Sequence, residues 1–174
     1  ACDAQGRSSL PGLWVAGEAA STGLHGANRL ASNGLLEALV FARRAADDIT
    51  AATPPVLAAP EVRLTPAPGG PAVDPADVAL LRGLMTAHVG VIRDAAGLRQ
   101  ALHGLAALAR KLQPEAMRNM IAAATLIAAA ALMRQESRGG HFRADFPQAD
   151  ASLAARSRLT LAAACALRDE KELA

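Results

Sequence analysis

The chain has 174 residues, of which 52% are hydrophobic and 2% aromatic, and a net charge of +2 with both signs mixed along the sequence. This size allows one ordinary domain, or a small domain with part of another. No basic block or row of aromatic side chains could follow a phosphate backbone and stack on bases, so we expect no nucleic-acid partner. Alanine and leucine supply most of the apolar share, which predicts a mainly α fold.

The two cysteines, Cys2 and Cys165, match no metal-ligand spacing and no disulfide framework. We therefore expect reduced thiols in a cytoplasmic protein without a metal site. No secretory signal is visible at the start of the sequence. The uncharged run between Arg118 and Arg134 is shorter than the roughly 18 residues of a membrane span, so we expect a buried helix and no membrane partner.

Residues 1–50 contain glycine-rich turns between apolar segments. Residues 12–16 (GLWVA) predict a short buried strand that leads into Gly17 and Glu18. A polar, glycine-rich loop follows over 21–33, and Ser32 or Asn33 can cap a helix that ends near Asp48. The apolar residues of this helix recur at helical spacing: Leu35, Leu36, Leu39 and Val40.

The loop combines residue types that suit an anionic ligand beside a cofactor. Glu18 follows the predicted strand and can accept hydrogen bonds from sugar hydroxyls. Gly23 and Gly26 allow sharp bends and a close approach of the backbone to a ligand. Arg29 offers a planar fork that binds a carboxylate through two hydrogen bonds. The helix that starts near Gly34 presents unpaired amides and the positive end of its dipole.

Residues 51–74 predict an extended linker, because proline occurs at seven positions between 53 and 75. Residues 75–147 form the expected helical domain, with helices from Pro75 to about His88, from Ile92 to Lys111, and from Glu115 to about Arg138, where glycines 139 and 140 end the last one. We expect a three-helix antiparallel bundle with no strand between residues 80 and 134, and a loose helix or tail over 148–174. The residues expected to face inward are Val78, Leu81, Leu84, Met85, Leu98, Leu102, Leu105, Leu108, Leu112, Met117, Met120, Ile121, Ala124, Ile127, Ala128, Ala131 and Leu132.

The run over 15–37, above all TGLHGANRLASN (22–33), resembles the last flavin-binding element of the succinate dehydrogenase, fumarate reductase and L-aspartate oxidase flavoprotein family. LMTAHVGVIRDAAGLRQAL (84–102) and ALMRQESRGGHFRADFP (131–147) are similar to the carboxy-terminal helical domain of that family. The resemblance covers about residues 8–147. Residues 1–50 would thus be the carboxy-terminal end of an FAD-binding domain.

The resemblance implies FAD as cofactor and a role for each matching residue. Glu18 corresponds to the family glutamate on the FAD ribose or ribityl chain, and Arg29 to the arginine that holds a substrate carboxylate. Asn33, Gly34 and Leu35 correspond to the helix start at the pyrimidine edge of the flavin, where the dipole stabilises negative charge. Gly34 stands where the family usually has serine, so a hydroxyl contact is lost while the backbone amides remain.

Within the family, Ala31-Ser32 and the short ending are similar to the L-aspartate oxidases, which oxidise L-aspartate to iminoaspartate for quinolinate and NAD synthesis. No G-x-G-x-x-G is present and no catalytic residue of the family matches, so we expect the upstream part of the same flavoenzyme to supply both, and the isolated chain to be inactive. A flavoprotein subunit of succinate dehydrogenase or fumarate reductase, and a non-catalytic helical interaction module, remain alternatives.

The other polar residues give weaker signals. His25 can lie near the site or order the loop, and both interpretations stay open. We expect the remaining three histidines (His88, His103 and His141) to be structural. Arg138 with Glu136 would connect the helical domain to the flavin domain.

Overall fold

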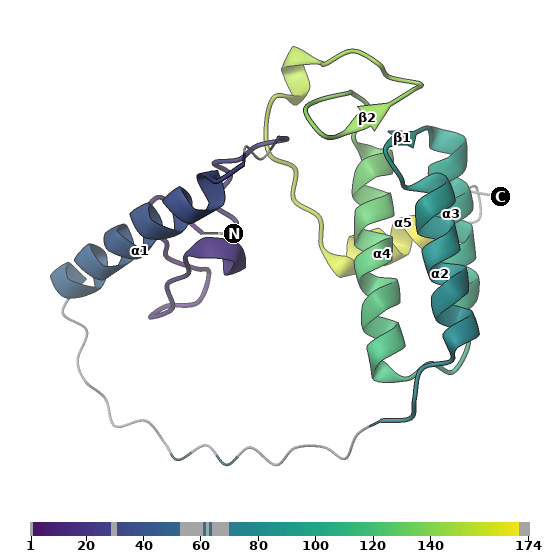
Figure 1. Ribbon diagram of the computed structural model, residues 1–174, viewed down its shortest axis with the longest axis horizontal. Coiled ribbons are helices and arrows are strands. Elements are labelled where there is room, and N and C mark those ends of the chain that lie inside the picture. Colours follow the sequence, from purple (N-terminus) through teal and green to yellow (C-terminus); the bar gives the residue numbers. More distant parts are fainter. Residues whose placement is uncertain (1, 29–30, 53–60, 62, 64–69, 171–174) are drawn as a thin grey trace. The chain divides into compact units, whose positions relative to one another are not determined.

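The computed structural model describes residues 2–28, 31–52, 61, 63 and 70–170 (Figure 1). The chain divides into two compact units, residues 1–64 and 65–174. Helices are the main regular structure of the described residues, as the composition predicts. Most of the expected linker over 51–74 lies outside the described residues.

The first unit is built on one helix, α1 (Asn33–Ala52), and a single 3-10 turn, η1 (Gly17–Ala19), that packs against it. The strand expected over 12–16 is absent: only an isolated antiparallel bridge joins Arg7 to Trp14. A strand needs a neighbour along its whole length to pair its backbone groups. Here residues 6–8 supply two hydrogen bonds, from Val15 N to Gly6 O at 2.8 Å and from Ser8 N to Leu13 O at 2.9 Å, which is too short a pairing for a strand.

Helix α1 is longer than expected, and its buried face does not contain the apolar residues that recur at helical spacing. It continues past Asp48 to Ala52, shortly before the first prolines of the linker, which disfavour helix. Glu37, Phe41 and Ala45 are its buried residues. The four apolar residues that the spacing singled out are exposed, at 75%, 60%, 70% and 48% for Leu35, Leu36, Leu39 and Val40.

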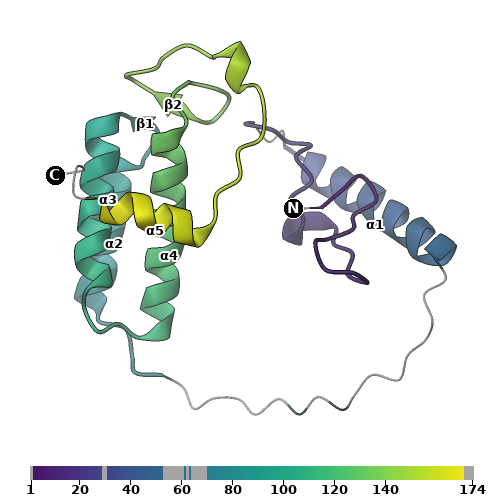
Figure 2. The same ribbon diagram turned by 180° about the vertical axis from the view of Figure 1, so that it is seen from behind.

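The second unit contains α2 (Pro75–His88), α3 (Ala95–Ala109), α4 (Glu115–Met133) and α5 (Leu161–Asp169), with the 3-10 turn η2 (Ala151–Leu153) before α5. Helix α3 packs between α2 and α4, and α5 crosses α3 and α4 (Figures 1 and 2). Side chains of Asp74, Asp94 and Thr160 cap α2, α3 and α5. The expected stripe of leucines in α3 is buried: Leu98, Leu102, Leu105 and Leu108.

Several boundaries differ from the sequence expectation. Ile92–Arg93 form β1, which pairs in parallel with β2 (Phe142–Arg143), so the expectation of no strand between residues 80 and 134 is wrong. The side chain of Asp94 accepts a hydrogen bond from Gly97 N, which starts α3 three residues later than expected. Helix α4 ends at Met133, and Gly139 adopts a positive φ of 58° in a turn instead of ending the helix.

Two residues expected in the core are exposed, and the end of the chain contains a helix, one of the two forms expected there. Leu112 lies beyond the end of α3 and is fully exposed, and Ile127 is 53% exposed on the outer side of α4. The tail contains a packed helix, α5, whose Ala164 is fully buried. Short alanine-rich segments carry little periodic signal, so the sequence leaves both a loose helix and a tail open there.

Helix α4 is the one segment among the described residues that is long and apolar enough to cross a membrane, judged by length and composition. It contacts both α3 and α5. Its fully buried residues Met117, Thr125, Ala128 and Ala129 face this packing. Such a helix fits the core of the second unit.

Candidate functional site

The residues expected to bind the cofactor lie at two neighbouring elements of the first unit. Glu18 is in η1 and is exposed. Asn33, Gly34 and Leu35 form the first turn of α1. Gly17, with φ of +70°, lies so close to α1 that a Cβ there would be 3.5 Å from Cβ of Ala38. The structure therefore brings Glu18 to the side of the helix, while Arg29 lies outside the described residues.

The loop between η1 and α1 bends at two glycines. Gly23 and Gly26 have φ of +86° and +55°, the left-handed region that favours glycine. Gly26 N donates to Gly23 O at 3.2 Å, and Asn28 N donates to His25 O at 3.1 Å. The loop thus consists of two consecutive tight turns.

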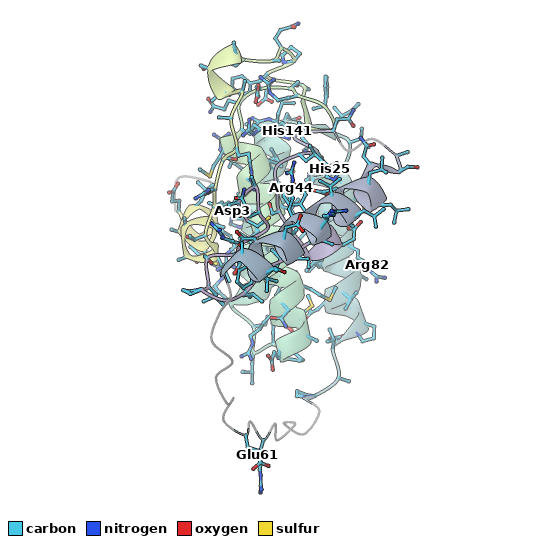
Figure 3. All side chains as sticks on the ribbon, turned by 90° about the vertical axis from the view of Figure 1, so that its left-hand side faces the viewer. Asp3, His25, Arg44, Glu61, Arg82 and His141 are labelled. Atoms are coloured by element: carbon cyan, nitrogen blue, oxygen red, sulfur yellow. The ribbon has the colours of Figure 1, made fainter. Side chains whose placement is uncertain are left out.

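A buried carboxylate on α1 holds this loop. Glu37 is 6% exposed and accepts hydrogen bonds from Thr22 Oγ1 and from His25 Nε2, the latter at 2.6 Å. Thr22 Oγ1 also accepts from Leu24 N at 3.1 Å. His25, labelled in Figure 3, therefore pairs with the helix, which favours the interpretation that it orders the loop. Sequence reasoning missed Glu37; the available signal was an acid one residue after the apolar pair at 35 and 36.

The other end of α1 is fixed by a second carboxylate. Asp48 accepts from Trp14 Nε1 at 2.8 Å and from Arg7 Nε at 2.7 Å, with a further bond to Arg7 Nη2. The hydrogen bonds of Arg7, and then of Trp14, lower the pKa of Asp48. Helix α1 is thus connected to residues 6–15 at one end and to the 21–28 loop at the other.

This arrangement fits a ligand that carries hydroxyls and negative charge. Glu18 provides an exposed carboxylate, and the first turn of α1 provides helix amides at the positive end of the dipole. A Cβ added at Gly26 would meet nothing within 4 Å, so space is open on that side of the loop. No group of three or more potential metal-ligating side chains occurs among the residues that the structure describes.

A polar network in the second unit surrounds the fully buried Glu136. Arg138 donates to it through Nε (3.0 and 3.1 Å) and Nη2 (2.8 Å), and Arg134 Nη1 and Asp150 N donate at 2.5 and 3.0 Å. The Arg138 hydrogen bonds are the main cause that lowers the pKa of Glu136 to about 2, against the effect of its burial. Glu136 and Arg138 therefore secure the segment after α4 within its own unit.

Arg143 is the largest fully buried side chain of the described residues. Its Nη1 donates to the carbonyls of Ala131 (2.8 Å) and Leu132 (3.0 Å), which caps α4, and its Nε and Nη2 donate to Asp145 at 2.8 and 2.7 Å. Asp145 also accepts from Ala95 N at 3.0 Å. The pair Arg143–Asp145 thus connects the end of α4 to the start of α3.

His141 belongs to the same region. Arg93 Nη1 donates to its Nδ1 at 2.9 Å, so Nε2 carries the proton that is donated to the carbonyl of Arg134 at 3.2 Å. Burial lowers the pKa of His141, and the charges of Arg93 and Arg143 act in the same direction, against the hydrogen bond to the Arg134 carbonyl. These contacts give His141 a structural role, as expected.

A cavity of about 500 Å³ lies beside α3 and α5. Its polar lining consists of His103, Arg110, Arg168, Asp169 and Glu170. Arg168 is already paired with Asp169 through two hydrogen bonds of 2.8 and 3.0 Å. The cavity is therefore lined in part by charges that satisfy each other.

Two models of known families match separate parts of the chain. The model of the family described as "Fumarate reductase flavoprotein C-term" matches residues 79–172, and that described as "FAD binding domain" matches residues 1–35. L-aspartate oxidase of Rhodospirillum rubrum is 53% identical over 85% of this chain and 54% of its own length. L-aspartate oxidase of Agrobacterium fabrum is 48% identical over 92% of this chain and 30% of its own length. The chain therefore spans between about a third and about half of the length of these relatives.

Solved structures show the same fold. The Mycobacterium smegmatis Sdh1 complex in the apo form matches with a TM-score of 0.61 and 34% identity, over 82% of this chain and 29% of that one. E. coli quinol fumarate reductase FrdA matches with a TM-score of 0.65 and 23% identity, over 87% of this chain and 32% of that one, which is a likeness of fold. Because a family model covers more than half of its residues, the chain belongs to the fumarate reductase flavoprotein family, and residues 79–172 are the carboxy-terminal domain of that family.

Proposed function

We propose that this chain is the carboxy-terminal part of an FAD-dependent L-aspartate oxidase, which converts L-aspartate to iminoaspartate for quinolinate and NAD synthesis. The observation that carries the proposal is the match to relatives of that name at 53% and 48% identity over 85% and 92% of the chain. Matches of that extent include residues of both the first and the second unit. A cytoplasmic location is part of the same proposal.

The residues of the first unit would hold FAD from one side. Glu18 would accept hydrogen bonds from the hydroxyls of the ribose or ribityl chain, and Asn33, Gly34 and Leu35 would place helix amides at the pyrimidine edge of the flavin. The exposed carboxylate in η1 and the first turn of α1 support these roles. The chemistry that FAD supplies when bound is the acceptance of a hydride from the substrate Cα.

Arg29 would bind one carboxylate of the dicarboxylate substrate. A guanidinium matches a carboxylate with two parallel hydrogen bonds and fixes its orientation as well as its position. The remaining substrate contacts, the catalytic residues and the pyrophosphate site would come from the upstream part of the same enzyme. The helical domain would be a three-helix antiparallel bundle of α2, α3 and α4, completed by α5.

The experiment replaces Arg29 in the whole enzyme and measures aspartate oxidation with flavin occupancy determined by absorbance. A hydrogen bond to a charged partner contributes about 1.5–3 kcal/mol, so loss of a bidentate contact predicts a fall in kcat/KM of at least about 10²-fold for Arg29→Ala. Arg29→Lys should recover part of this loss, because an ammonium keeps the charge without the fork. FAD should stay bound, because Glu18 and the helix start are unchanged.

Arg43→Ala is the matched control, since Arg43 is 83% exposed on α1 and pairs only loosely with Asp47 at 3.7 Å. It should leave kcat/KM unchanged. An Arg29→Ala enzyme that keeps full FAD and nearly normal kcat/KM contradicts the substrate assignment. Release of ammonia from aspartate, compared with oxidation of succinate, separates the proposed oxidase from the dehydrogenase members of the family.

A further inference from the structure

We propose that Glu37 is a positioning residue for the substrate site, through its contacts with Thr22 and His25. These three side chains are named the loop latch. The latch sets the path of the 21–28 loop, which leads directly into Arg29 along the chain. This inference rests on the proposed function, because it assigns to the latch the placement of the substrate-binding arginine.

The burial of Glu37 is the first argument. Its side chain is 6% exposed on the face of α1 that also buries Phe41 and Ala45. A buried carboxylate is unfavourable unless hydrogen bonds satisfy it. Thr22 Oγ1 and His25 Nε2, at 2.6 Å for the histidine, supply such bonds from a single loop. The helix therefore holds this loop through a buried carboxylate.

The geometry of the loop is the second argument. Thr22 and His25 flank Gly23 and Leu24; the φ of Gly23 is +86°, and Thr22 Oγ1 accepts a hydrogen bond from Leu24 N at 3.1 Å. After His25, its carbonyl accepts from Asn28 N at 3.1 Å, which closes the turn immediately before residue 29. Two attachment points three residues apart fix both the start and the direction of the turn that precedes the arginine.

The FAD-loaded whole enzyme is used for the test, with two pairs of variants. Glu37→Gln keeps the shape and removes the charge, whereas Glu37→Asp keeps the charge on a side chain one carbon shorter. Thr22→Val removes the hydroxyl, whereas Thr22→Ser retains it. Asp47→Asn is the control, because it removes a carboxylate from the same helix at a side chain that is 72% exposed.

A small displacement of a positioning group lowers the rate by up to about 10²-fold, so we expect Glu37→Gln to reduce kcat/KM for aspartate by about 10- to 100-fold. Most of the change should be in KM, because a contact to the bound carboxylate is weakened before the reaction. The dissociation constant of malonate, an unreactive dicarboxylate, should rise by a similar factor when measured from the flavin spectrum. Thr22→Val should show a smaller change of the same kind, and Thr22→Ser and Asp47→Asn should match the wild type.

A merely structural role predicts a different pattern: a lower Tm or flavin occupancy, with KM and malonate affinity per bound flavin unchanged. That result for Glu37→Gln overturns the inference. If the wild type oxidises succinate instead of aspartate, the proposed function fails. The effect of the loop latch variants on kcat/KM is then measured with succinate as the substrate, so the positioning role is still tested. A wild type that binds no dicarboxylate refutes both.

Discussion

Replacement of Arg143 by methionine removes the most buried cation of the helical unit while keeping an unbranched side chain. Its guanidinium is fully buried and donates to the carbonyls of Ala131 and Leu132 and to both oxygens of Asp145. Breaking a buried ion pair by removing one partner costs about 3–5 kcal/mol. Asp145 is 30% exposed and regains some hydration, so we expect a loss of about 3 kcal/mol in the free energy of unfolding.

The measurement is urea unfolding of the 174-residue chain, followed by circular dichroism at 222 nm, which reports mainly on the helices of the second unit. Arg143→Lys keeps a charge but not the fork and should lose roughly half as much. Arg118→Met, at an exposed position of the same helix α4, is the control and should stay within about 0.5 kcal/mol of the wild type. Equal stability of Arg143→Met and Arg118→Met would refute the role assigned to the buried guanidinium.

Glu136 and Asp145 have their pKa values lowered to about 2, from 4.5 and 3.8, so they should stabilise the fold fully above about pH 4.5 and progressively less as the pH falls towards 2. The urea midpoints at pH 7 and 5 should therefore be similar and the midpoint at pH 3 lower, with a smaller drop in Glu136→Gln. Gly104→Ala should lower the Tm, because its Cβ would lie 2.6 Å from a methyl group of Leu84, whereas Gly83→Ala, with nothing within 4 Å, should raise the stability by up to about 1 kcal/mol. The isolated chain, which lacks the pyrophosphate-binding glycines, should bind FAD weakly and show no turnover; a yellow preparation with stoichiometric flavin absorbance would disprove this.

The helical unit was largely predictable because its signals are local. The Leu98–Leu108 stripe and the caps at Asp74 and Thr160 depend on residues only a few positions apart, although the Thr160 cap was not recognised. Errors arose where partners distant in sequence decide the structure. The sequence pattern places Ile92 in a helix, because its pairing with Phe142, fifty residues later, leaves no periodic signal.

The sequence predicts the glycine turns of the candidate site, but it does not predict the buried carboxylate that holds the loop. Gly23 and Gly26 adopt the left-handed conformations that their type allows. The burial of Glu37 and the exposure of Leu35 and Leu36 run against ordinary hydrophobic patterning, so the pattern alone does not identify the buried face of α1. A buried acid with a histidine twelve residues earlier becomes recognisable only once the helix and the loop are placed together.

The most direct measurement of the proposed function is anaerobic reduction of the flavin in the whole enzyme by L-aspartate. We predict that stoichiometric L-aspartate bleaches the flavin absorbance within a single turnover, that ammonia appears after hydrolysis of the imine product, and that succinate produces no bleaching under the same conditions. Bleaching by succinate and not by L-aspartate, or a whole enzyme purified without flavin, would contradict the account.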